Sequence, residues 1–194
     1  MNRKRMRTTI ILLVVLSLVS GGLITLLMAL RSPVLDQPVT VLPGVVLTPQ
    51  DFTAAGMGSA LSVQYAGSSF VFYADASGAE LADAKSGFTV ELQDGASVTV
   101  LCGRFVDDAS HVLRDKAYAW YRSEAVSAGL VDDTGASVIG DASAHYAASD
   151  VAAVLVRRND AVFTLLYTLG AAASNPGVPL AAAQALARTL ASRL

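Results

Sequence analysis

The feature that most constrains this chain is an uncharged apolar run close to its N-terminus. Residues 8–30 contain no charged side chain, and Arg31 closes the run. As a helix, about 23 residues rise roughly 34 Å, which is enough to cross a hydrocarbon core of about 30 Å. Residues 8–30 therefore predict a transmembrane helix in the lipid bilayer, and only the remainder of the chain has to fold as a water-facing domain.

The charges on either side of this run predict its orientation. Residues 1–7 form a basic tail with four basic and no acidic side chains, and such tails stay in the cytoplasm. Beyond Arg31 there are sixteen acidic and nine basic side chains, a formal charge of −7. We therefore expect a single-pass protein of the cytoplasmic membrane with its N-terminus inside and its C-terminal domain outside. An acidic domain lacks the basic face that nucleic acid requires, so nucleic acid is not expected as a partner.

Two interpretations of the apolar run stay open. A cleaved signal peptide has an apolar region of about 7–15 residues, and Leu27 stands where a small residue should precede Ala29 at a cleavage site. Both observations favour a signal anchor that is retained. Within it, Ser17, Gly21 and Gly22 are candidate membrane-helix contacts, because small residues four apart let helices approach closely. Glycine and serine are also common in membrane helices, and they can mark a kink.

The residues after the anchor predict a tether and then one domain. Residues 31–47 contain three prolines and are expected to form an extended tether, so the extracytoplasmic domain is expected over 48–194. Thr48 followed by Pro49 and Asp51 predicts the start of a short helix that ends near Gly56. Alternating apolar and polar residues then predict strands, with tight turns between them. The expected strands are 61–65, 70–72, 88–92 and 98–102, with turns at Gly67-Ser68 and Asp94-Gly95.

The second half adds two helices and a central pair of strands. Asp107 and Asp108 are expected to open a helix that ends before Gly129. Its expected core-facing stripe is Leu113, Ala117, Trp120, Ala125 and Ala128. Residues 151–156 are apolar at every position, which is typical of a central strand covered on both faces. A turn at 157–160, a partner strand over 163–167 and a last helix from Pro179 complete an α+β domain, an antiparallel sheet flanked by helices.

An aromatic cluster is the candidate ligand-binding site. Tyr118, Trp120 and Tyr121 lie together on the predicted helix. They can pack in the core, or they can line a ligand cleft between this helix and the sheet.

The raw material for catalysis is scarce. His111 and Asp115 stand one helical turn apart and could form either an exposed ion pair or an acid–base couple, and His145 is the second histidine. A third ligand with zinc-site spacing, a serine nucleophile motif and a phosphate-binding loop are all lacking in the sequence. We therefore expect no catalytic residues, no metal and no cofactor. Cys102, the only cysteine, is expected to be a buried apolar residue, with an intermolecular disulfide as the alternative.

Residues 97–194 resemble a known class of outer domains. The order is Val98-x-Val100, Phe105, a helix rich in Ala and Tyr, residues 138–142, an apolar strand that ends in 157–160, and an Ala/Leu-rich final helix. This order resembles extracytoplasmic domains of actinobacterial lipoproteins and receptor kinases, several of which have a PsbP-like sheet flanked by helices. The chain departs from the lipoproteins because it lacks a lipid-attachment cysteine. The resemblance implies binding rather than catalysis.

These observations together predict a membrane-anchored extracytoplasmic binding or assembly module. Its expected partner is a membrane protein complex or an envelope protein, beside which it could act as an accessory subunit. A small-ligand carrier or sensor domain is one alternative. An envelope enzyme that uses His111, Asp115 and His145 is the other.

Overall fold

The computed structural model of the chain describes residues 35, 37–67, 70–133, 135–170 and 179–194. The expected transmembrane helix over 8–30, with its candidate contacts Ser17, Gly21 and Gly22, lies outside these residues. No helix in the described part of the chain is long and apolar enough to cross a membrane.

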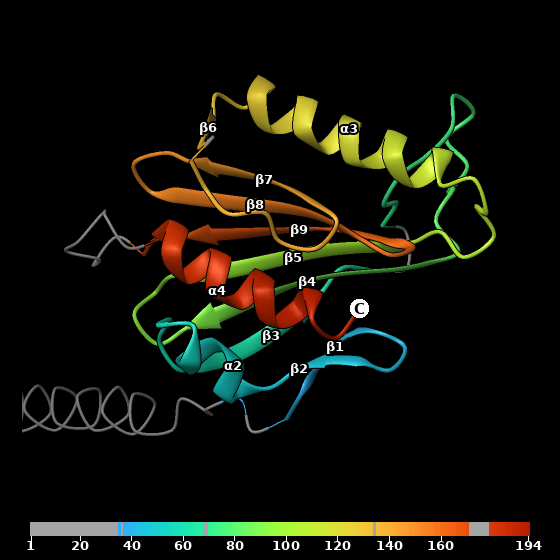
Figure 1. The fold of residues 1–194 in the computed structure, drawn as a ribbon. Helices are drawn as coiled ribbons and strands as arrows, with labels where there is room; N and C mark the ends of the chain where they lie inside the picture. Colours follow the sequence, from blue (N-terminus) through green and yellow to red (C-terminus); the bar gives the residue numbers. More distant parts are fainter. Residues whose placement is uncertain (1–34, 36, 68–69, 134, 171–178) are drawn as a thin grey trace, which may run out of the picture. The chain divides into compact units, whose positions relative to one another are not determined.

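A seven-stranded sheet, antiparallel throughout, forms the centre of the domain (Figure 1). The prediction of an α+β domain with a large antiparallel sheet is thus confirmed. The strands follow the order β3-β4-β5-β9-β8-β7-β6. Their bounds are β3 (Ala60–Tyr65), β4 (Ala84–Leu92), β5 (Ser97–Arg104), β6 (Val131–Asp132), β7 (Ala142–Ala147), β8 (Val151–Arg158) and β9 (Ala161–Thr168).

Strand β8 lies where the continuous apolar run 151–156 predicts a strand that is covered on both faces, and β9 is its partner strand. Val154 and Val156 belong to one hydrophobic cluster, and Ala153 and Leu155 belong to the other on the opposite face. Successive side chains of a strand point to opposite faces, so both faces of β8 are buried. Asn159 adopts a positive φ of 51° in the turn to β9, a conformation that asparagine tolerates better than most residues.

One face of the sheet is covered from β7 to β4. Helix α4 (Pro179–Ala191) packs on β7, β8 and β9 through Ala183, Leu186 and Leu190, all of which are fully buried. Helix α2 (Pro49–Ala54) contacts α4 and begins at the predicted cap, where the Thr48 amide donates to the Asp51 carboxylate at 2.6 Å. A hairpin of β1 (Val39–Leu42) and β2 (Val45–Leu47) completes this face beside β4 and β5.

The expected tether over 31–47 is therefore wrong in its C-terminal part. Val39, Val41 and Leu47 have no exposed surface, and they belong to the same hydrophobic cluster as α4. The folded domain accordingly includes residues well before Thr48, and residues 34–194 form one compact unit.

The opposite face of the sheet is covered only in part. Helix α3 (Val112–Ser127) packs on β8 and β9, and the loop 70–82 covers one end of the sheet through Phe72. The strand expected over 70–72 is wrong, because β3 pairs with β4 and not with this segment. The outer strands β3 and β4 have no helix over them on this face (Figure 1).

Glu80 holds the loop 70–82 in place. Its carboxylate accepts hydrogen bonds from the backbone amides of Phe72 at 2.7 Å and Tyr73 at 3.0 Å, and it pairs with Lys85 at 3.0 Å. Burial acts to raise the pKa of Glu80, but these hydrogen bonds outweigh it and hold the pKa below the ordinary value. A charged Glu80 thus holds this segment together with a single antiparallel bridge between Ala74 and Glu80.

The start and the inner side of α3 differ from the prediction. The helix begins at Val112, and Asp108 caps it from the preceding loop by accepting from the amides of Leu113 at 2.6 Å and Arg114 at 3.1 Å. Ala117 is buried as expected, whereas Trp120 is 44% exposed. The core-facing stripe is thus rotated toward Arg114 and Tyr121, and the prediction of an inward Trp120 is wrong.

Cys102 lies on the α4 face of β5 with no exposed surface, as the buried interpretation predicts. Burial raises the pKa of its thiol to about 12. Because the thiolate is the reactive species, Cys102 is not placed to form an intermolecular disulfide in the folded domain.

Candidate ligand-binding cavity

A cavity of about 260 Å³ lies between the second half of α3 and the sheet. Tyr121, Glu124, Ala125 and Ala128 line it from α3, Leu101 from β5, Ala153 from β8, and Thr164 and Leu166 from β9, with Leu130 closing one end. It exists because α3 is rich in alanine on this side, so the helix backbone comes over the sheet with too little side-chain volume to fill the space beneath it.

A second hollow, of about 230 Å³, lies over β3, β4 and β5, and Leu101 lines both this hollow and the cavity. The floor of that hollow includes Thr89 and Thr99, whose hydroxyls lie 2.9 Å apart in a cross-strand hydrogen bond. The apolar cavity under the helix and a more polar hollow over the open strands thus share Leu101 as a lining residue.

Thr164 is the buried polar residue of the cavity. It is 7% exposed, and it is the one polar side chain among the wall residues that come from β5, β8 and β9. The other side chains around it are apolar, apart from the Tyr121 hydroxyl and the exposed Glu124 at the rim. The Thr164 hydroxyl can therefore orient a ligand that carries a hydrogen-bonding group.

Tyr121 joins the cavity to the loop 70–82. Its hydroxyl donates to the backbone carbonyl of Phe72 at 2.9 Å, and the two rings lie 4.9 Å apart. Burial raises the pKa of Tyr121 far above its ordinary value, so the hydroxyl stays protonated and can keep donating. Tyr121 therefore fixes the end of the cavity nearest to the loop.

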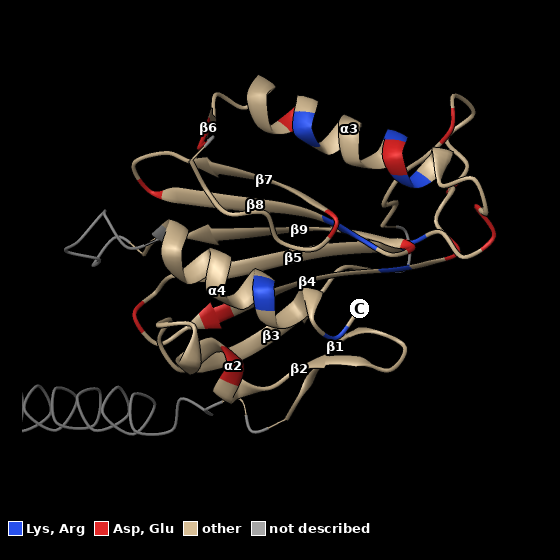
Figure 2. Cartoon of the chain, in the orientation of Figure 1, with Lys and Arg blue, Asp and Glu red and all other residues tan. Residues whose placement is uncertain are grey.

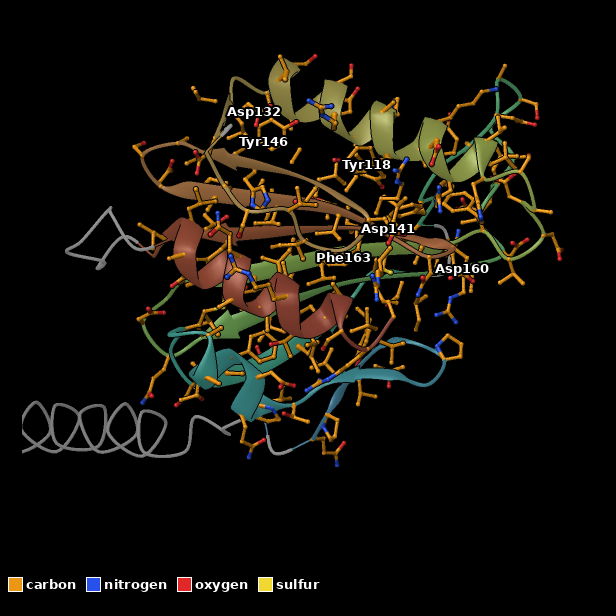
Figure 3. All side chains as sticks on the ribbon, in the orientation of Figure 1. Tyr118, Asp132, Asp141, Tyr146, Asp160 and Phe163 are labelled. Atoms are coloured by element: carbon orange, nitrogen blue, oxygen red, sulfur yellow. The ribbon has the colours of Figure 1, made fainter. Side chains whose placement is uncertain are left out.

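The structure separates the three aromatic residues that the sequence groups together. Tyr121 lines the cavity, whereas Trp120 lies outside it and packs on Tyr121 and Tyr73 with centroid distances of 4.7 and 6.2 Å. Tyr118 lies between α3 and the sheet (Figure 3), and it does not line the cavity. The Arg157 guanidinium stands 5.8 Å from the Tyr118 ring, an arrangement typical of a cation–π contact.

The residues considered for catalysis do not come together. The Asp115 carboxylate binds Arg114 and Arg157, each at 2.9 Å, and not the side chain of His111. Burial acts to raise the pKa of Asp115, but the two arginines outweigh it and lower the pKa below its ordinary value. His111 lies in a left-handed conformation at the start of α3, with φ at 58°.

His145 lies on the other side of the sheet. It pairs in register with Val154, which faces α4, and it is 3% exposed. Its Nε2 lies 2.8 Å from the Ser143 hydroxyl, which also accepts a hydrogen bond from the Ile139 amide at 2.9 Å. Burial lowers the pKa of His145, which favours the neutral ring. The His145 side chain is thus enclosed, and the sheet separates it from His111 and Asp115.

No group of three histidine, cysteine or acidic side chains placed to hold a metal ion is present within the described residues. Charged residues lie mostly in loops, at strand ends and on the helices, and the middle of the sheet is nearly free of them (Figure 2). The candidate site is therefore the mostly apolar cavity beneath α3, with Thr164 in its wall.

Most of the cavity residues were not candidates in the sequence. Thr164, Ala153 and Leu101 come from three strands that are distant along the chain, and only the sheet order brings them side by side. Thr164 carries the one local signal, since it is a hydroxyl within an otherwise apolar segment of a central strand. The sequence predicts a cleft between this helix and the sheet, but it does not predict which strands line it.

Comparison with known proteins gives no match: no protein-family model, no curated protein and no solved structure is similar to this chain. The resemblance to actinobacterial outer domains with a PsbP-like sheet thus stays a prediction.

Proposed function

We propose that this domain is a binding module that accepts a small apolar ligand in the cavity beneath α3. The observation that carries the proposal is the nearly buried Thr164 side chain in the wall of a mostly apolar cavity of about 260 Å³. Ligand pockets combine mostly apolar walls with a few polar groups that orient the ligand, and this cavity has that composition. Its volume of about 260 Å³ is large enough for one or two fused rings.

A two-ring probe with one hydroxyl tests the proposal. With a chain of residues 34–194, we expect 2-naphthol to bind saturably and more tightly than naphthalene, because only the naphthol hydroxyl can bond to Thr164. One hydrogen bond corresponds to a difference in affinity of roughly 2- to 10-fold between the two ligands. Thr164→Val keeps the side-chain shape and removes the hydroxyl, so it should abolish this difference in affinity. Ala125→Phe fills the cavity and should weaken both ligands at least tenfold. The measurement is a fluorescence titration of each ligand.

Ala119→Phe is the matched control, because Ala119 lies on the exposed side of the same helix and does not line the cavity. It should leave both affinities unchanged. If 2-naphthol bound equally well to the Ala125→Phe variant, the ligand would lie elsewhere and the proposal would be wrong.

We further propose that the module is a single-pass protein of the cytoplasmic membrane, with residues 8–30 in the bilayer and the acidic domain outside. The basic residues of the segment 1–7 and the formal charge of −7 beyond Arg31 support this topology. An anchored domain of this kind can serve as an accessory subunit, because one membrane helix raises its effective concentration beside a larger membrane complex.

Labelling of intact cells with a membrane-impermeant thiol reagent tests the topology. A cysteine introduced by Ser123→Cys, at an exposed position of α3, should react, and one introduced by Asn2→Cys should not. Native Cys102 can stay in place, because its buried thiol should react only after denaturation. Labelling at position 2 with protection at position 123 would reverse the proposed orientation.

A further inference from the structure

Another pocket, of about 270 Å³, lies on the α4 face of the sheet, which is the face opposite to that of α3. Residues 138–140 form one wall, Arg158 at the end of β8 forms another, and Arg188 and Ala191 of α4 form the third. Gly140 has a φ of +68°, and a Cβ there would lie 2.7 Å from the Arg157 carbonyl oxygen. The loop wall can therefore lie this close to β8 only because residue 140 is a glycine.

Arg188 has no acidic partner in this pocket. Nine basic residues follow Arg31, and among the described residues only Lys116 and Arg188 lack a salt bridge. Within the described part of the chain, the Arg188 side chain makes one hydrogen bond, to the Ser137 hydroxyl at 3.1 Å. A guanidinium has five N–H donors, so most of those on Arg188 are free to bind a ligand.

Arg158 is held only loosely by an acid. Its Nη1 lies 3.4 Å from Oδ1 of Asp141, which is at the limit of a hydrogen bond. The other oxygen of that carboxylate accepts from the Asn159 amide at 2.7 Å. Asp141 thus fixes the β8–β9 turn, near which Figure 3 places it, and leaves most of the Arg158 donors unused.

We propose that this pocket binds a small organic oxyanion, a carboxylate or phosphate that carries a short apolar group. Two guanidiniums that face one pocket match the paired oxygens of such an anion, which they can bind with parallel hydrogen bonds. Val138, Ile139 and Ala191 provide apolar walls for the remainder of the ligand. The pocket is independent of the cavity beneath α3, because the two lie on opposite faces of the sheet.

Calorimetric titration of the full-length protein in a nonionic detergent tests the proposal. Butyrate should bind saturably and more tightly than acetate, because its longer chain reaches the apolar walls, and chloride should not bind. Inorganic phosphate should compete with butyrate, which would extend the site to phosphate groups. If phosphate fails to compete, the site is selective for carboxylates and the proposal holds in that narrower form.

Variants that each remove one positive charge distinguish binding in the pocket from general electrostatic attraction of the anion to the protein. Arg188→Gln should raise the dissociation constant of butyrate at least tenfold, and Arg158→Gln should have a similar effect. Lys116→Gln removes the same charge from an exposed site on α3 and should change it less than twofold. Arg188 is exposed, so its variant should keep the fold and can decide the question even if Arg158→Gln is unstable. Absence of saturable butyrate binding, or equal losses in Arg188→Gln and Lys116→Gln, would overturn the proposal.

Discussion

A chain that begins at residue 48 should fail to fold, whereas a chain that begins at residue 34 should fold and melt cooperatively. The difference between them is the β1–β2 hairpin, which covers β4 and β5 on the α4 face. Five of its side chains are no more than 3% exposed, namely Val39, Val41, Leu42, Val45 and Leu47. Each contributes about 1.5–3 kcal/mol when it is buried, so the hairpin contributes on the order of 10 kcal/mol. Domains of this size have a total stability of about 5–15 kcal/mol.

Circular dichroism and thermal melting of the two purified chains measure this effect. Single substitutions give a finer test within the intact domain. Val41→Ala, at a fully buried position, should lower the melting temperature much more than Val46→Ala, at the half-exposed position on the neighbouring strand. A cooperative melt of the chain 48–194 near the temperature of the longer chain would mean that the hairpin is dispensable and that the domain begins at Thr48.

The hairpin shows why this part of the fold was not predicted from the sequence. Three prolines favour an extended tether, but Pro43 and Gly44 also form a two-residue turn signal between two apolar runs. Gly44 adopts a φ of +80°, and the turn pairs Leu42 with Val45. The strands are only four and three residues long, and their stability comes from packing on β4 and β5, which no local pattern reveals.

Long apolar patterns predict the central elements well, because they report burial directly. The run 151–156 needs cover on both faces wherever it lies in the sheet. The turn at Asp94-Gly95, which joins β4 to β5, forms as predicted because Gly95 takes a φ of +79°. Helix α3 is less well specified. Its many alanines fit both the core-facing and the exposed side of the helix. The size of Trp120 suggests a core position, but Trp120 is exposed and Tyr121 packs toward the sheet instead.

The second large effect should come from Gly103 on β5. A Cβ built at this position would overlap the ring of Phe72, which lies across the sheet at the end of the α3 face. Strand β5 is central and pairs with both β4 and β9, so the backbone cannot move away without loss of ladder hydrogen bonds. Gly103→Ala should therefore displace Phe72 and lower the free energy of unfolding by about 1–3 kcal/mol.

A double-mutant cycle with Phe72 identifies the cause. Phe72→Ala alone should cost about 3–5 kcal/mol, because the ring is almost fully buried. In that background Gly103→Ala should cost nothing or stabilise by up to about 1 kcal/mol, since glycine weakens a strand relative to alanine. Gly58→Ala is the control, because its Cβ would meet only the Asp94 side chain at an ordinary 3.7 Å.

The same cycle connects this packing to the proposed ligand site. Phe72 accepts the Tyr121 hydrogen bond through its backbone carbonyl, so a displaced Phe72 also frees the residue that closes the cavity beneath α3. Gly103→Ala should then weaken 2-naphthol binding although Gly103 does not line the cavity. Urea unfolding of the four chains of the cycle and naphthol titration of Gly103→Ala measure the two effects. Equal stability losses for Gly103→Ala with and without the Phe72 ring would show that the strand itself, and not the ring over it, requires glycine.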